Sequence, residues 1–173
     1  MATEGGHVDF APRTDQEIEL LRYLRAKVGG RVSIERVLSG PGFYDLYCFL
    51  RDSGHAAESP QVARLLNTGD PNPTITCLGL AGEDPLCVAT LQMFSTLYSA
   101  EAGNLALKCL ATGGVFVGGG NAPKVLPVLQ NGSFMRGFAD KGRFTGLMNS
   151  IEVSVALNPR AALIGAAYYA LHM

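Results

Sequence analysis

Apolar positions recur mostly with a helical period, and two stretches carry the pattern most clearly. The first lies between a Thr14–Glu17 capping box and the Gly29-Gly30 pair, and four residues share its apolar face: Ile18, Leu21, Leu24 and Val28. The second begins at Asp84-Pro85 and runs to about Leu110 without a further proline. The pattern therefore predicts helices over about 15–28 and 85–110.

Shorter patterns predict the remaining elements. Pro41 and Ala122-Pro123 are each suited to the first turn of a helix, and further helices are expected over 61–66, 133–140 and 160–171. The apolar run 115–117, bounded by glycines, and the segment 151–157 are typical of strands, the first of them buried. Residues 53–82 contain many turn formers and predict a variable surface excursion. The chain is thus expected to be a helix-rich α/β protein.

Composition narrows the class of protein. The 173 residues are 47% hydrophobic and 17% charged, and 14 basic against 15 acidic side chains leave a net charge of -1. This balance excludes an intrinsically disordered chain and argues against a general nucleic-acid binder. The apolar stretch 161–171 is far shorter than the roughly 20 residues of a spanning helix, and the N-terminus lacks a signal peptide, so we expect no membrane association and a cytoplasmic protein.

The four cysteines argue against a metal centre. They lie far apart in the sequence with no Cys-x-x-Cys pair: Cys48, Cys77, Cys87 and Cys109. That spacing disfavours zinc binding and a disulfide framework, so we expect reduced and mostly buried thiols.

Two segments are candidates for chemistry. In the first, the strand 115–117 leads through Gly118-Gly119-Gly120-Asn121 into a helix, and glycines there would let a ligand approach the backbone. This segment is neither a dinucleotide fingerprint nor a P-loop, and a structural tight turn explains it equally well. In the second, Glu4, His7 and the more distant Glu35 offer the donors and acceptors that hold sugar hydroxyls. A solvated tail with a helix-capping glutamate is the alternative there.

Together with several shorter blocks, these segments resemble one family. Residues 4–12 (EGGHVDFAP), 32–42 (VSIERVLSGPG), 103–107 (GNLAL), 113–120 (GGVFVGGG), 140–144 (DKGRF) and Asn158-Pro159 resemble the bacterial-type glucokinases, in the family's order and at about its spacing. Zinc-dependent relatives carry a cysteine cluster near their histidine and this chain has none, so it resembles the zinc-free branch of that family.

The resemblance implies an incomplete actin-like ATPase (ribonuclease H-like) large domain of a glucokinase. It implies that Glu4, His7 and Glu35 bind glucose, and that ATP, which carries Mg²⁺, lies against Gly118, Gly119, Gly120 and Asn121. The family more often has an apolar residue at the position of Asn121. The implied reaction is the ATP-dependent phosphorylation of glucose to glucose 6-phosphate.

The resemblance also implies that part of the enzyme is missing. Family members begin with an N-terminal half that holds an Asp-x-Gly-Gly-Thr phosphate-binding turn and an Asn-Asp pair with the general base, and neither motif occurs here. We therefore expect residues 1–173 to be a C-terminal large-domain portion with no catalytic residue, no metal ligand and little activity alone. Asp9, two residues after His7, is expected to be structural. An exposed sheet edge would favour a homodimer or poor solubility.

Other functions stay open on the sequence alone. A non-catalytic sugar-binding or regulatory relative of glucokinase is the main alternative, whereas a nucleotide-dependent oxidoreductase and a purely structural oligomer are more remote. The C-terminal Leu171-His172-Met173 has only a faint similarity to a peroxisomal address.

Overall fold

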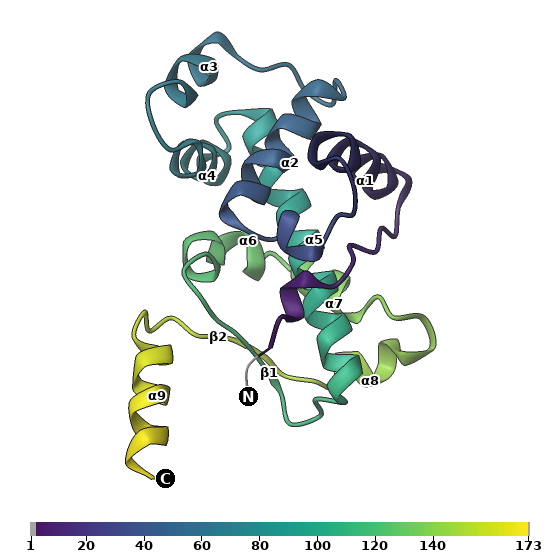
Figure 1. Cartoon of the computed structure of the whole chain (residues 1–173), viewed down its shortest axis with the longest axis vertical. Helices are drawn as coiled ribbons and strands as arrows, with labels where there is room; N and C mark the ends of the chain where they lie inside the picture. The colour runs from purple at the N-terminus through teal and green to yellow at the C-terminus, as the bar shows by residue number, and fades with distance from the viewer. Residues whose placement is uncertain (1–2, 173) are drawn as a thin grey trace. The chain divides into compact units, whose positions relative to one another are not determined.

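The computed structural model describes residues 3–172, which form two compact units (Figure 1). The first unit ends at Tyr98 and the second begins at Ser99. Met173, the last residue of the C-terminal tripeptide discussed above, lies outside the described residues. The expectation that residues 1–173 make one large-domain portion stays a prediction.

The first unit is built from helices. Two short 3-10 helices, η1 (Gly5–His7) and η2 (Ile34–Arg36), accompany α1 (Asp15–Val28), α2 (Gly40–Asp52), α3 (Pro60–Leu66), α4 (Pro71–Ala81) and the first part of α5 (Pro85–Cys109). Tyr47, on α2, is fully buried, and the ring of Phe43 meets that of Phe94 on α5 edge to face at 5.3 Å. The predicted helices at 15–28 and from Asp84-Pro85 are confirmed.

Capping groups fix both ends of α1. The Thr14 hydroxyl accepts a hydrogen bond from the Glu17 N–H at 3.2 Å, and Gly29 ends the helix in the left-handed region with φ of 72°. The Glu17 carboxylate accepts from the N–H of Arg13, one residue before the N-cap, at 2.6 Å. The buried apolar side chains are Leu20 and Leu24, whereas Ile18 is 36% exposed. The buried face of α1 is therefore centred on Leu20 and Leu24 and is rotated away from the predicted position of Ile18.

Helix α4 (Pro71–Ala81) corrects the interpretation of residues 53–82 as a surface excursion rich in turns. Pro71 lies in the first turn, where a missing N–H costs nothing, and the Asp70 side chain accepts from the Asn72 N–H at 3.0 Å. Ile75 is fully buried. A Cβ atom on Gly79 would lie 2.7 Å from the Cys87 carbonyl oxygen, so α4 touches α5 backbone to backbone. Part of the 53–82 segment therefore belongs to the core.

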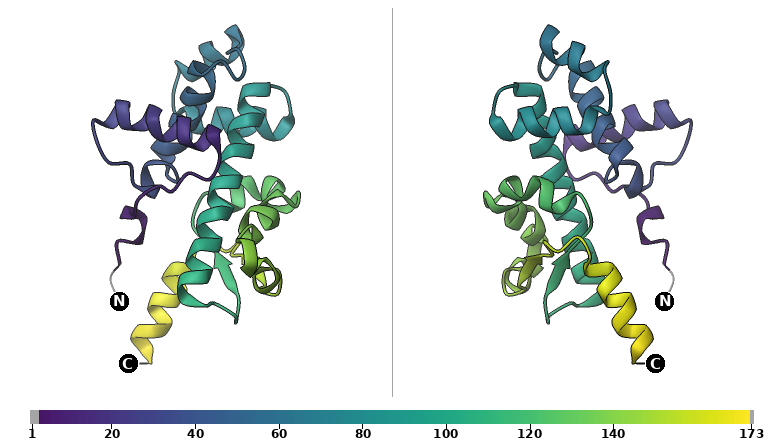
Figure 2. Two further views of the ribbon diagram at one scale, coloured as in Figure 1. Left: turned by 90° about the vertical axis from the view of Figure 1, so that its right-hand side faces the viewer. Right: turned by 90° about the vertical axis from the view of Figure 1, so that its left-hand side faces the viewer.

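The second unit surrounds a small parallel sheet. Its two strands are β1 (Val115–Val117) and β2 (Val153–Val155), paired in register from Val115↔Val153 to Val117↔Val155. The helical elements are the end of α5, η3 (Ala122–Val125), α6 (Leu126–Gln130), α7 (Ser133–Ala139), η4 (Gly142–Phe144), α8 (Thr145–Asn149) and α9 (Ala161–Leu171), which Figure 2 shows from two sides. The expected strand at 151–157 is shorter than predicted, and the final helix begins one residue later.

Glycine lets α5 and α7 approach closely in this unit. A Cβ atom on Gly103 would lie 2.5 Å from the Phe138 carbonyl oxygen, closer than such atoms come in proteins. The Lys141 ammonium donates to the Ala100 carbonyl at 3.1 Å. The Gly103 and Asp140-Lys141 blocks of the sequence therefore have a packing role.

The two faces of β1 differ in exposure, whereas the sequence predicted a buried strand. Val117 is 5% exposed, as predicted, but Phe116 is 81% exposed. Successive side chains of a strand point to opposite faces, so Val117 shares its face with the paired Val155, and Phe116 shares the other face with Ser154. The prediction of a strand is confirmed, and the prediction of full burial is wrong for Phe116.

The expectation about the thiols is half right. All four cysteines are free, but only Cys48 and Cys87 are buried, whereas Cys77 and Cys109 are exposed. Within residues 3–172 no three potential metal ligands come together, and no helix there is both long and apolar enough to cross a membrane.

Candidate functional site

The turns that carry Glu4, His7 and Glu35 are held side by side by a short antiparallel pairing. The Phe10 N–H donates to the Val32 carbonyl at 3.0 Å, and the Ile34 N–H donates to the Val8 carbonyl at 2.9 Å. These bonds place η1 against η2: a Cβ atom built on Gly6 would lie 3.6 Å from the Glu35 Cβ. Segments about thirty residues apart in sequence thus form one surface.

All three predicted sugar-binding side chains are exposed on this surface. Glu4 and His7 lie at the two ends of η1, where the His7 N–H donates to the Glu4 carbonyl at 2.9 Å, and Glu35 lies in the middle of η2. Two carboxylates accept hydrogen bonds and a neutral imidazole both donates and accepts. The arrangement is therefore chemically suited to fixing the hydroxyl groups of a small polar ligand.

Arg31 ties η1 to the neighbouring strand-like segment. One guanidinium nitrogen donates to the His7 carbonyl at 2.8 Å and to the Asp9 carboxylate at 2.7 Å. Asp9 itself pairs with Ser33 in an isolated antiparallel bridge. Asp9 therefore contacts two residues within the first unit, its structural role stays a prediction, and Arg31 restrains the backbone of His7.

Helix α2 packs closely against η2 and the residue that follows it. The Ser39 hydroxyl accepts from the Gly42 N–H at 3.1 Å and caps the helix. A Cβ atom on Gly42 would lie 2.5 Å from the Val37 carbonyl oxygen and 2.7 Å from that of Arg36. Only glycine permits this approach, so the Ser39–Gly42 block sets the position of the turn that carries Glu35.

The predicted nucleotide-binding residues lie in the second unit, directly after β1. Gly119 needs glycine because its φ is 96°. Gly120 has no such positive φ, and a Cβ atom added there would meet nothing within 4 Å. Gly118, Gly119, Gly120 and Asn121 are all exposed, so the turn leaves room for a ligand to approach the backbone.

The element after the glycine turn is shorter than expected. The Asn121 carbonyl accepts from the Lys124 N–H at 3.0 Å, and this begins the four-residue η3 followed by the five-residue α6. A helix this short contributes little dipole, so the expected attraction of anions to its N-terminus receives no support here. What the turn offers is an exposed backbone with open space around Gly119 and Gly120.

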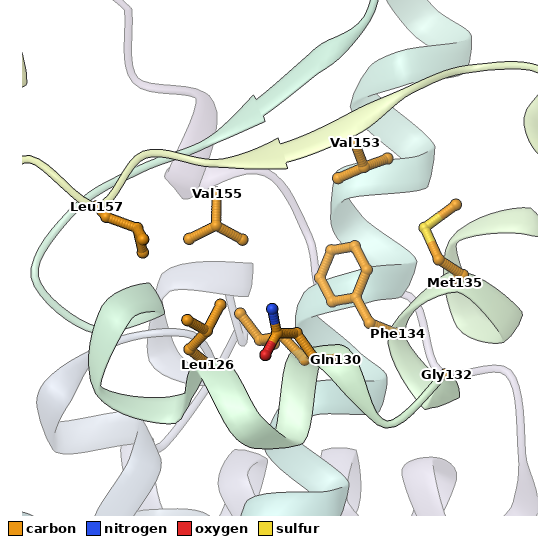
Figure 3. Close-up of a pocket in the computed structure, with 9 residues that line it drawn as sticks. Leu126, Gln130, Gly132, Phe134, Met135, Val153, Val155 and Leu157 are labelled. Carbon is orange, nitrogen blue, oxygen red and sulfur yellow. The ribbon is translucent and has the colours of Figure 1, made fainter.

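A cavity of about 510 Å³ lies between β2 and the helices α6 and α7 (Figure 3). Val153 and Val155 point from the strand toward Leu126, Gln130 and Phe134. The lining is mostly apolar and includes none of the glycine-turn residues. The cavity is therefore distinct from the predicted nucleotide-binding turn.

The sequence did not predict the roles of two residues of the first unit that shape the site, Arg31 and Gly42. Arg31 gave no signal, because its partner is a backbone carbonyl that only the fold brings near. Gly42 lies in the segment 32–42 that resembles the glucokinases. A glycine in the first turn of a predicted helix is the one local feature that could have indicated a close contact there.

Comparisons with known proteins agree on one family. The family model described as Glucokinase matches residues 1–173. A glucokinase of Nostoc punctiforme is 46% identical over 183 residues, covering 99% of this chain and 54% of its own length. A glucokinase of Synechocystis is 47% identical, covering 96% of this chain and 50% of its own length. The chain thus spans about half the length of the curated relatives it matches.

Solved structures extend the agreement to the fold. The crystal structure of a glucokinase from an Antarctic psychrotroph matches all of this chain and 51% of its own, with a TM-score of 0.81 and 32% identity. A glucokinase of Balamuthia mandrillaris, solved in complex with glucose, matches 92% of this chain with a TM-score of 0.76, and at 20% identity it supports the fold alone. The incomplete actin-like ATPase fold expected from the sequence is confirmed by these glucokinase neighbours, and with the family model matching the full length, the chain belongs to the glucokinase family.

Proposed function

We propose that this chain provides the sugar-binding surface and part of the nucleotide site of an ATP-dependent glucokinase. The observation that carries the proposal is the pairing of η1 with η2, which gathers Glu4, His7 and Glu35 on one exposed surface. Each side chain would hold a glucose hydroxyl. Gly118, Gly119, Gly120 and Asn121 would contact the adenosine side of ATP.

In the proposed reaction the glucose O6 attacks the γ-phosphorus of ATP. The O–P bond to glucose forms as the bond to the β-phosphate oxygen breaks, which gives glucose 6-phosphate and ADP, and the hydroxyl proton leaves to a general base. Mg²⁺ bound to the ATP substrate would neutralise the phosphate charge. The aspartate base and the phosphate-binding turn would come from the part of a glucokinase that this chain does not span.

The residues of this chain would act on position rather than on bond breaking. Holding the acceptor hydroxyl in line with the γ-phosphate lowers the entropic part of the barrier. A missing general base typically costs about 10²- to 10⁴-fold in rate. The chain alone would therefore bind glucose but show little or no turnover, and we propose a cytoplasmic location for the assembled enzyme.

Calorimetric titration of the chain with glucose tests the sugar site directly. Replacing a carboxylate that holds a hydroxyl costs about 1–3 kcal/mol, so Glu35→Gln should weaken binding by about 5- to 150-fold. Glu19→Gln, a change at an exposed glutamate of α1, is the matched control. The proposal fails if the wild-type chain binds no glucose alone and none when the remaining part of a related glucokinase is added.

A sugar-binding or regulatory relative without phosphoryl transfer is the second candidate. It shares the η1–η2 surface and differs in the outcome of reconstitution. If the chain binds glucose but the combined halves form no glucose 6-phosphate from glucose and MgATP, the regulatory function replaces the kinase.

A further inference from the structure

Helix α4 reaches the first turn of α2 through one side chain. The Asn72 Nδ2 group donates a hydrogen bond to the Gly40 carbonyl at 2.9 Å, across 32 positions of the sequence. A Cβ atom added to Gly40 would lie 3.6 Å from the same nitrogen, so the contact is close. Figure 1 shows α4 beside α2. The segment 53–82, predicted to be a variable excursion, therefore contacts the helix that packs against η2.

The turn that carries Asn72 has little freedom to move. Asn72 stands between Pro71 and Pro73, whose rings hold φ at about −65°. Its own backbone N–H donates to the Asp70 carboxylate at 3.0 Å. One turn further along α4, Ile75 is fully buried and anchors the helix. The Asn72 side chain is thus presented to α2 from a rigid helix end.

The Asn72 amide has one orientation that fits its surroundings. A carbonyl oxygen can only accept, so the nitrogen of the amide must face Gly40. The Oδ1 atom is buried and has no hydrogen-bond partner among residues 3–172. Because an unpaired buried oxygen is unfavourable, an apolar side chain would serve better for packing alone. The hydrogen bond to Gly40 is therefore the contact that distinguishes asparagine at this position.

The first turn of α2 connects Gly40 to the turn that carries Glu35. The Ser39 hydroxyl accepts from the Gly42 N–H at 3.1 Å, so capping bonds surround Gly40 on both sides. At Gly42 an added Cβ atom would lie 2.5 Å from the Val37 carbonyl oxygen, which leaves no free space between the two backbones. Val37 directly follows η2, in which Glu35 is the middle residue. A displacement of Gly40 is thus transmitted to Glu35 through backbone contacts.

We propose that Asn72 is a positioning residue of the sugar site: its hydrogen bond to Gly40 holds the first turn of α2, and with it Glu35, in place to bind a glucose hydroxyl. The inference rests on the proposed function for the identity of the ligand. Asn72 acts through α2 rather than through contact with the sugar. It lies outside the segments that resemble the glucokinases, so two chains with the same three sugar-binding residues can differ in glucose affinity through α4.

Calorimetric titration with glucose compares three variants of this chain with the wild type. Asn72→Ala removes the donor and should weaken glucose binding by about two- to tenfold, the factor that a hydrogen bond of this kind typically contributes. Asn72→Asp keeps the shape and places an oxygen against the Gly40 carbonyl, so it should weaken binding at least as much. Ile75→Val is the matched control, because it loosens α4 at a fully buried side chain and keeps the Asn72 donor; it should change the affinity by less than about twofold.

A double-mutant cycle separates the positioning of Glu35 from a general loss of stability. In a Glu35→Gln background, Asn72→Ala should change the affinity by less than about twofold, because the carboxylate that it positions is absent. In a Glu4→Gln background it should keep its full effect, since Glu4 lies on η1. Amide exchange at Val37, measured by NMR, should be several-fold faster in Asn72→Ala and unchanged in Ile75→Val.

The outcomes distinguish this inference from the proposed function. The inference is overturned if Asn72→Ala binds glucose as tightly as the wild type, or if Ile75→Val weakens binding equally. It is also overturned if the losses from Asn72→Ala and Glu35→Gln simply add. If the wild-type chain binds no glucose, the proposed function fails, and exchange at Val37 still decides whether Asn72 holds the turn: an unchanged rate would refute it.

Discussion

Replacing Gly42 with alanine should destabilise the chain and disturb the turn that carries Glu35. The added Cβ would lie 2.5 Å from the Val37 carbonyl oxygen, 2.7 Å from the Val37 carbonyl carbon and 2.7 Å from the Arg36 carbonyl oxygen. All three atoms belong to the backbone, so no side chain can rotate away. To lengthen the 2.5 Å contact between this Cβ atom and the Val37 carbonyl oxygen to even 3.0 Å, α2 and the η2 turn must move apart by about 0.5 Å.

A forced shift of this kind in a packed region typically costs about 1–3 kcal/mol. A loss of about 2 kcal/mol lowers Tm by about 4–8 °C when a chain of this size unfolds as a whole. Because a movement of η2 relieves the strain, glucose should also bind more weakly at the proposed site.

Chemical denaturation and glucose titration of the same samples measure both effects. Gly30→Ala is the matched control, because an alanine there meets nothing within 4 Å and no positive φ. The control should be neutral or stabilising by about 0.4–1 kcal/mol. Equal stability of the two variants would refute the argument that backbone contact at Gly42 positions η2.

Three further predictions concern thiols, acid stability and the η1 turn. Burial raises the pKa of Cys87 to about 12, so at pH 8 a thiol reagent should modify only two of the four cysteines in the folded chain: Cys77 and Cys109, not Cys48 and Cys87. The hydrogen bond from Arg51 lowers the pKa of Asp52, so Asp52 should stabilise the fold above its unfolded pKa of about 4 and lose that contribution as pH falls further. Asp52→Asn should therefore cost less than about 1 kcal/mol at neutral pH, and this cost should shrink as the solution becomes more acidic. Arg31→Ala should speed amide exchange at His7 several-fold, measured by NMR.

These outcomes can be contradicted separately. Four reactive thiols in the folded chain would mean that α2 or α5 opens readily. A constant difference between Asp52→Asn and wild type down to pH 2 would remove the ion pair as its cause. Unchanged exchange at His7, with Arg22→Ala as the control at another exposed arginine, would show that Arg31 does not restrain η1.

Local signals in the sequence predicted the elements whose ends are set by their own residues. Thr14 and Gly29 bracket α1, and Asp84 and the proline-free run predicted α5. Helix α4 was missed because Pro71-Asn72-Pro73 matches a turn as well as a helical first turn. The burial of Ile75 against the rest of the unit, which decides between them, is a tertiary contact and leaves no local mark.

The candidate site was predictable in its residues and not in its geometry. Resemblance supplied Glu4, His7 and Glu35, but the hydrogen bonds of Phe10 and Ile34 that join their turns run between distant segments. Periodicity likewise predicted β1 as a strand. It could not predict the exposure of Phe116, because an apolar run at a glycine boundary has the same sequence whether or not a partner covers it.

The bare surface of α9 also has a consequence for the protein inside a cell. Chains aggregate through exposed apolar surface of this kind. In cells, chaperones and proteases continuously remove such chains. Leu163 and Leu171 of α9 are 68% and 83% exposed, so the chain is expected to aggregate through this helix as its concentration rises.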